Sequence, residues 1–133
     1  MKYLFITNVR PLEPLLDFDV EQFNIDLHNE YECNQILKNK SEIEFHFQKF
    51  QSSTLYSESN IVLVFSGVYE SSLESPNSTH NISYPLTLSN FARGELAEGH
   101  KYFKDNQIRY YFLEFFEGIK IDLFCREAII ILW

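Results

Sequence analysis

Alternation of apolar and polar residues recurs along the chain and predicts β-strands. QFNIDLH, residues 22–28, and EIEFHFQKF, residues 42–50, carry an apolar side chain at every second position. Because successive side chains of a strand point to opposite faces, each segment is expected to bury one face. NIVLVFSGV, residues 60–68, is apolar on both faces, which is typical of a central strand. KYLFITN, residues 2–8, is a further candidate strand.

The most hydrophobic stretch is YYFLEFFEGIKIDLFCREAIIIL, residues 110–132. Its alternation predicts a β-hairpin over about residues 107–125, with a two-residue turn at Glu117-Gly118, where glycine permits a positive φ. Around residues 126–128 two outcomes stay open. A second turn can send residues 129–133 back as a last strand, or a bulge can let the same strand continue.

The remaining segments carry weaker patterns. Residues 69–106 form a polar, turn-prone excursion with one short strand expected around residues 82–88, followed by a partly helical pattern over residues 91–104. NEYECNQILKN, residues 29–39, favours a hairpin connection over a helical turn. PLEPLLDFD, residues 11–19, is proline-rich and predicts only a short turn of helix near Leu15.

Together these segments predict one domain, residues 1–133, of mainly β class with α+β as the alternative. We expect an antiparallel sheet or sandwich with a long excursion before a C-terminal hairpin. Long excursions on rigid β scaffolds often carry binding residues.

The charge balance indicates which kinds of partner the protein can bind. The 133 residues include 19 acids and 11 bases, a formal charge of -8. This argues against nucleic-acid binding, which needs surplus Lys and Arg, and it suits a basic protein partner. No apolar run reaches the length of a membrane span, and the apolar run at the start is too short for a secretory signal. With only two cysteines, the expected location is the reducing cytoplasm.

Candidate catalytic and metal-binding residues do not form a recognised motif. His28 and His46 lie on the polar faces of two predicted strands, without the third ligand that a zinc site wants. Ser66-Gly67 follows an apolar strand but lacks the leading glycine of a nucleophile elbow, since Val64 stands there. Cys125 shares the apolar face of its predicted strand and is expected to be buried, whereas a catalytic thiol must be exposed. We therefore expect no catalytic site, metal or cofactor, although an enzyme using His28 or His46 is a third class to test.

Acidic and aromatic residues are the candidates for partner binding. An acidic run is interspersed with apolar residues near the start, a second acidic pair follows residue 94, and the last part of the chain is rich in tyrosine. Carboxylates steer a cationic partner and aromatic side chains supply binding energy. The predicted partner-binding residues are Glu13, Asp17, Asp19, Glu21, Glu95, Glu98 and Tyr102, and the same tyrosine-rich part contains Tyr84, Tyr110 and Tyr111.

The order of these segments resembles a known family. An alternating strand, FNIDLH, precedes a second, EIEFHF; then come a buried strand, IVLVFSGV, a variable polar middle and a late strand, IKIDLFC. Over roughly residues 20–132 this is similar to the small acidic β-rich immunity proteins of bacterial polymorphic toxin systems. The likeness lies in strand patterns, so no binding residue is carried over from it.

The resemblance implies a non-enzymatic protein that binds and neutralises one cognate toxin domain, often a nuclease with a basic cleft. The alternative is a small-molecule-binding β-barrel or sandwich, in which the many aromatic residues line a pocket.

Overall fold

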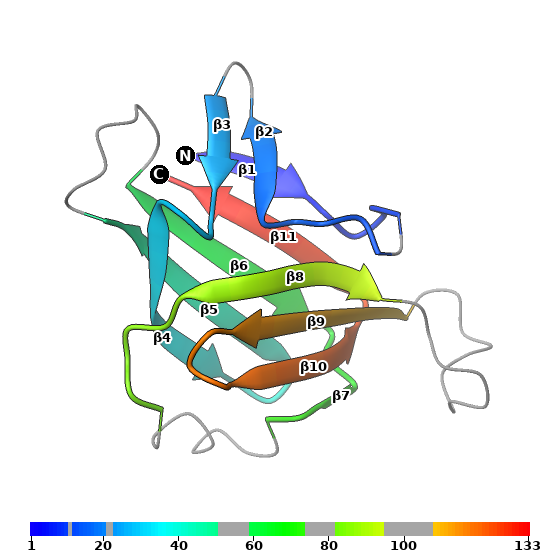
Figure 1. Cartoon of the computed structure of the whole chain (residues 1–133). Coiled ribbons are helices and arrows are strands. Elements are labelled where there is room, and N and C mark those ends of the chain that lie inside the picture. The colour runs from blue at the N-terminus through cyan, green and yellow to red at the C-terminus, as the bar shows by residue number, and fades with distance from the viewer. Residues whose placement is uncertain (11, 21–22, 51–58, 74–81, 95–107) are drawn as a thin grey trace.

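The chain folds into antiparallel β-sheets (Figure 1). The computed structural model describes residues 1–10, 12–20, 23–50, 59–73, 82–94 and 108–133, and within these it contains no helix. The mainly β prediction is confirmed. The strands are β1 (Lys2–Phe5), β2 (Asp17–Val20), β3 (Phe23–Asp26), β4 (Tyr31–Lys38), β5 (Glu42–Lys49), β6 (Asn60–Ser66), β7 (Glu70–Ser71), β8 (Leu88–Gly94), β9 (Arg109–Phe115), β10 (Lys120–Cys125) and β11 (Glu127–Leu132).

The larger sheet has five strands in the order β1-β11-β6-β5-β4. The predicted strands at the start of the chain and at residues 42–50 and 60–68 are confirmed, and β6 is central, as its two apolar faces indicate. The alternation in β5 buries Ile43, Phe45 and Phe47 on the inner face. β2 and β3 form a separate two-stranded hairpin, and Ile25 of β3 is buried in the common core.

The smaller sheet has four strands in the order β7-β10-β9-β8. The predicted C-terminal hairpin is β9–β10, and strands from the polar excursion flank it on both sides. The turn differs from the predicted two-residue form. Gly118 donates to the carbonyl of Phe115, and Phe115 donates to Ile119, so the loop has three residues and ends on Gly118 with φ 91°. In this type of turn the last loop residue is a glycine that forms a bulge. Gly118 is therefore the third residue of a three-residue loop, whereas the prediction made it the second residue of a two-residue loop.

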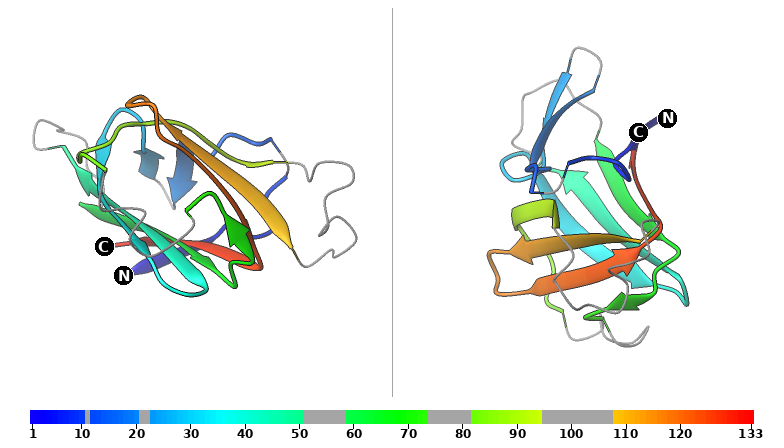
Figure 2. Two further views of the ribbon diagram at one scale, coloured as in Figure 1. Left: turned by 90° about the horizontal axis from the view of Figure 1, so that it is seen from below. Right: turned by 90° about the vertical axis from the view of Figure 1, so that its right-hand side faces the viewer.

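The two sheets pack face to face with the core between them (Figure 2). Aromatic side chains of the larger sheet contact those of the smaller one. The Phe45 ring centroid lies 6.4 Å from Phe115, and the Phe65 centroid lies 6.1 Å from Phe91 and 5.3 Å from Tyr111. Such aromatic contacts add to the free energy gained by burying the rings, so they join the sheets into one core.

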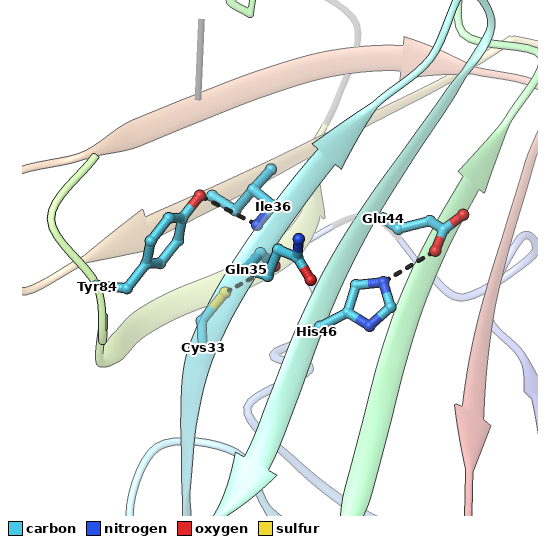
Figure 3. Close-up of polar contacts among 6 residues, drawn as sticks. All are labelled: Cys33, Gln35, Ile36, Glu44, His46 and Tyr84. Carbon is cyan, nitrogen blue, oxygen red and sulfur yellow. Dashed lines mark hydrogen bonds and ion pairs between the residues drawn. The ribbon is translucent and has the colours of Figure 1, made fainter. Parts of the chain in front are cut away.

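The prediction for residues 29–39 was wrong, because these residues contain strand β4. A bulge at Asn34 shifts the phase: Cys33 is buried, and the next buried position is Ile36 rather than residue 35. Two hydrogen bonds stabilise this irregularity (Figure 3): the Ile36 amide donates to the Tyr84 hydroxyl at 3.0 Å, and the Cys33 thiol donates to the Gln35 carbonyl at 3.6 Å. The broken alternation made the strand unrecognisable.

Three further expectations are corrected. No helical turn forms near Leu15; its amide donates to Phe91, and the segment runs along the edge of β8. The strand expected around residues 82–88 is instead β8, which begins at Leu88. Residues 91–94, the first four of the predicted helical pattern, are therefore extended, and residues 95–104 of that pattern lie outside the described residues. At Arg126 the chain neither turns back onto β10 nor stays in its sheet; it passes to the larger sheet as β11.

Candidate functional site

The outer face of β9 and β10 gathers aromatic and acidic side chains. Alternation buries Tyr111, Leu113 and Phe115 on the inner side of β9 and leaves the residues between them half-buried on the outer side. The strand register places these opposite the outward residues of β10. We call this surface the aromatic face; it consists of Tyr110, Phe112, Glu114, Lys120, Asp122 and Phe124.

The aromatic rings of this face are held close together. The Tyr110 ring stacks on Phe124 with centroids 4.9 Å apart and an interplanar angle of 25°, and it lies 6.2 Å from Phe112. Gly94 of β8 lies beneath Tyr110: a β carbon there would stand 2.5 Å from the ring. The absence of a side chain at Gly94 therefore lets the tyrosine lie close to the sheet.

Carboxylates border the rings. The Tyr110 hydroxyl donates to Asp122 Oδ1 at 2.5 Å, and the Glu114 carboxylate lies 3.9 Å from Lys120 Nζ across the strands. Partial burial raises the pKa of Tyr110 above its usual 10, and the hydrogen bond to Asp122 and the charges of Asp122 and Glu114 raise it further. The tyrosine therefore remains a neutral donor at physiological pH, and Asp122 is held in place as an acceptor.

A surface cavity of about 440 Å³ opens on this face. Leu12 forms part of its wall, since the Leu12 amide donates to Arg93 at the edge of β8. The wall is completed by Gly94, Tyr110, Phe112, Leu113, Glu114, Lys120 and Asp122. A hollow with aromatic walls and carboxylates at its rim is suited to a cationic side chain such as Lys or Arg, because ring faces and carboxylates both attract positive charge.

The predicted acidic run lies on another element, the β2–β3 hairpin. Asp17 and Asp19 are exposed on the outer side of β2, and the Asn24 side-chain amide on β3 donates to both carboxylates. Glu13 lies in the segment between this hairpin and Leu12 and pairs with Arg10 at 3.8 Å. The predicted residues Glu21, Glu95, Glu98 and Tyr102 lie outside the described residues.

The other tyrosines of the predicted set have structural contacts. Tyr111 is fully buried, and its hydroxyl donates to the carbonyls of Ile6 and Thr7 at 2.9 and 3.2 Å. Tyr84 accepts the hydrogen bond from the β4 bulge. Of the tyrosines in that set whose positions are described, only Tyr110 contributes to the aromatic face.

The two histidines considered above, His28 and His46, do not converge. His28 Nδ1 lies 2.8 Å from the Leu88 carbonyl, and its ring is 5.1 Å from that of Phe116. His46 pairs instead with Glu44 on the outer face of β5, at 2.9 Å (Figure 3). Among the described residues, no group of three His, Cys, Asp or Glu side chains could hold a metal ion.

Both cysteines are buried, as predicted for Cys125. Burial is the main cause that raises the pKa of Cys33 and of Cys125 to about 12. Because the thiolate is the reactive form, both thiols are poor nucleophiles at neutral pH. Ser66 ends β6 within an antiparallel sheet, and the strand-to-helix turn of a nucleophile elbow is not formed there.

An exposed apolar surface on the larger sheet was not predicted. Tyr3 and Phe5 of β1 are 55% and 75% exposed, and the register places them beside Ile131 and Ile129 of β11. Val64 of β6 lies opposite Ile129 in the register and extends this apolar surface. The signal was available in the alternation of KYLF, but which of its faces is outward depends on pairing with β11. Residues of this apolar face offer a second contact surface.

Comparison with protein-family models, with curated proteins and with solved structures finds no match for this chain. The described residues also contain no helix long and apolar enough to cross a membrane.

Proposed function

We propose that this protein is a non-enzymatic binding protein of the immunity type, which neutralises a cognate basic toxin domain in the cytoplasm. The observation that carries the proposal is the aromatic face, where Tyr110, Phe112 and Phe124 stand beside Asp122 and Glu114. Protein interfaces gain most of their binding energy from a few aromatic and charged side chains. A lysine or arginine of the toxin would enter the cavity of this face.

The overall charge supports the same partner. A formal charge of -8 attracts a basic domain from a distance and speeds encounter at low salt. The same negative charge disfavours contact between this protein and nucleic acid. The two would instead compete for the same basic surface of the toxin. Blocking a nuclease cleft by mimicking its acidic substrate is therefore physically consistent with this chain.

The β2–β3 hairpin, which we call the acidic hairpin because it carries Asp17 and Asp19, extends the aromatic face. Leu12 lines the cavity of the aromatic face, and the segment from Leu12 to Leu15 runs along the edge of β8. It leads into β2, which carries Asp17 and Asp19 (Figure 1). In the proposal, the rings anchor the partner, and Glu13, Asp17 and Asp19 steer it. Glu21, Glu95, Glu98 and Tyr102 are proposed as further contacts on the sequence pattern alone.

The test is co-expression with the toxin domain encoded beside the gene, scored by cell survival and by co-purification. We expect the wild-type chain to protect and to bind with one-to-one stoichiometry. Glu114→Lys together with Asp122→Lys should abolish protection, because both changes set positive charge against a basic partner. The lack of any toxin gene in the neighbourhood, or a neighbouring toxin that does not bind, would contradict the immunity assignment.

Matched charge reversals locate the interface. Asp17→Lys, Asp19→Lys and Glu21→Lys together should slow association at low salt while leaving the dissociation rate nearly unchanged, because distant charges act on encounter. An unchanged association rate would remove the acidic hairpin from the interface and leave the aromatic face. Phe5→Lys on the apolar face should leave binding intact; loss of binding there, with normal binding by the Glu114/Asp122 variant, would move the interface to the larger sheet.

A further inference from the structure

A second cavity lies at the corner where β10 passes into β11. Its volume is about 560 Å³, and it lies within the range of small-molecule sites. Residues from the start of the chain, the end of β6 and the beginnings of β9 and β11 meet there. The lining residues are Phe5, Thr7, Asn8, Ser66, Arg109, Arg126, Glu127, Ala128 and Ile129.

The lining is positive in an acidic protein. Its charged lining residues are two arginines, Arg109 and Arg126, and one carboxylate, Glu127. The whole chain has 19 acids against 11 bases, so this cluster of guanidinium groups is opposite in sign to the net charge of the protein. Guanidinium groups bind carboxylate and phosphate oxygens through paired N–H donors, so this cleft has the chemistry of an oxyanion site.

Neighbouring residues position both arginines. Arg126 Nη2 donates to the Tyr69 hydroxyl, and its Cζ lies 5.0 Å from the centre of the Tyr69 ring. Gly67, with φ 63°, lets the Arg126 stem pack closely, since a β carbon at Gly67 would stand 3.0 Å from Arg126 Cβ. Arg109 Nη2 lies 3.4 Å from Asn8 Oδ1, at the start of β9. A preorganised side chain loses less entropy on binding than a mobile one.

The rest of the wall divides into polar and apolar parts. Asn8 and Ser66 offer further polar groups, whereas the Thr7 hydroxyl is already bonded to the Ala128 backbone at 3.0 and 3.2 Å. Phe5 and Ile129, which are opposite each other in the β1–β11 register, give an apolar surface. A ligand that fits both parts carries an oxyanion on a flat apolar body.

We propose that this arginine cleft binds a small aromatic oxyanion, with the phosphate or carboxylate between Arg109 and Arg126 and the ring against Phe5 and Ile129. The site is separate from the aromatic face, and the inference does not rest on the immunity function. A carboxylate and a phosphate monoester share the chemistry that the arginines recognise, and the probes below separate them.

The experiment titrates the full chain with phenyl phosphate, benzoate and benzyl alcohol, followed by calorimetry or by NMR shifts of the Arg109 and Arg126 side chains. Phenyl phosphate or benzoate should bind the wild-type protein, and the tighter of the two identifies the oxyanion. Benzyl alcohol should bind at least tenfold more weakly. Equal affinity for benzyl alcohol, or no binding of either anion at millimolar concentration, would overturn the proposal.

Variants assign the binding to the cleft. Arg126→Gln, at an exposed position, and Arg109→Lys, which keeps the charge of a half-buried residue but loses the paired donors, should each weaken binding about tenfold or more. Arg10→Gln is the matched control, because Arg10 is exposed and pairs only weakly with Glu13 outside the cleft. Unchanged affinity of the folded Arg126→Gln protein, or an equal loss in Arg10→Gln, would show that the anion binds elsewhere.

Discussion

The ring of Tyr110 lies directly over Gly94, so close that a β carbon at Gly94 would stand 2.5 Å from ring atom Cδ2 and 2.6 Å from Cε2. The two residues are opposite each other in the β8–β9 register. The position of Tyr110, and with it the stack on Phe124 and the hydrogen bond to Asp122, therefore depends on the missing side chain at residue 94.

Gly94→Ala should displace the Tyr110 ring. We expect the free energy of unfolding to fall by about 1–3 kcal/mol, the usual cost of overpacking. Urea denaturation measures the change. The same substitution in a Tyr110→Ala background should cost much less, since the clash is gone; equal costs in the two backgrounds would show that Gly94 is required for another reason.

Tyr111→Phe tests the polar contact inside the core. The Tyr111 hydroxyl donates to two carbonyls of the chain start, Ile6 and Thr7. Its removal leaves buried acceptors without this donor, so we expect a loss of about 1–3 kcal/mol in the free energy of unfolding. Tyr3→Phe, on an exposed strand, should change stability by less than about 0.5 kcal/mol. Equal effects of the two substitutions would contradict the assigned role.

Local pattern predicted those parts of the fold in which a strand keeps its alternation. β5, β9 and β10 do so, β6 was predicted from its continuous apolar run, and Gly118 marks the turn of the C-terminal hairpin. β4 escaped prediction because the bulge at Asn34 changes the phase within the strand. The corner at Arg126 escaped for another reason: the residues around it are compatible with either sheet, and the pairing of β11 with β1 and β6 is decided by distant segments.

The candidate site was predictable in kind and only partly in place. The combination of tyrosine with acids was foreseen, and Tyr110, Asp122 and Glu114 belong to one predicted hairpin. The predicted two-residue turn, however, would pair Asp122 with Leu113 and put it on the face opposite Tyr110; the three-residue loop shifts the register by one and brings the two together. Gly94 and Leu12 reach the same cavity through tertiary contacts that no local pattern encodes. The acids Asp17 and Asp19 were chosen from their spacing, whereas the fold puts them on a separate hairpin.

The buried thiols predict a loss of stability at high pH. The folded state holds the pKa of Cys33 and Cys125 at about 12, against 9 in the unfolded chain. Their contribution is complete below pH 9 and is lost as the pH rises from 9 to 12, with a slope of at most about 1.4 kcal/mol per pH unit for each thiol. Urea midpoints measured from pH 8 to 11 test this.

The control replaces both thiols. Cys33→Ala with Cys125→Ala should lower stability at every pH, because cavities form, but should remove the slope between pH 9 and 10. Above pH 10 Tyr111 adds its own dependence, since burial raises its pKa as well. A wild-type stability that stays constant from pH 8 to 11 would refute the buried, protonated state of the thiols.

Asn24→Asp should destabilise the acidic hairpin. The Asn24 amide donates to both Asp17 and Asp19, and the substitution replaces this donor by a third carboxylate. We expect a loss of about 1–2 kcal/mol at neutral pH and low salt, which shrinks in high salt and as the pH falls below about 4. Asn34→Asp is the control, because Asn34 donates to the neutral Gln48 amide at 2.9 Å. An equal, salt-independent loss in both variants would contradict the electrostatic explanation.

Tyr84→Phe should loosen the β4 bulge. The Tyr84 hydroxyl accepts the hydrogen bond from the amide of Ile36, a residue that is only 1% exposed (Figure 3). Without this acceptor the Ile36 amide lacks a partner in a buried strand, so we expect a loss of about 1–3 kcal/mol in the free energy of unfolding. Hydrogen exchange should accelerate at Ile36, while exchange in the central strand β6 changes only with global stability. Since Tyr3→Phe removes the same hydroxyl from an exposed strand, a Tyr84→Phe protein no less stable than Tyr3→Phe, with Ile36 still protected, would show that the bulge is stabilised by the β4–β5 pairing alone.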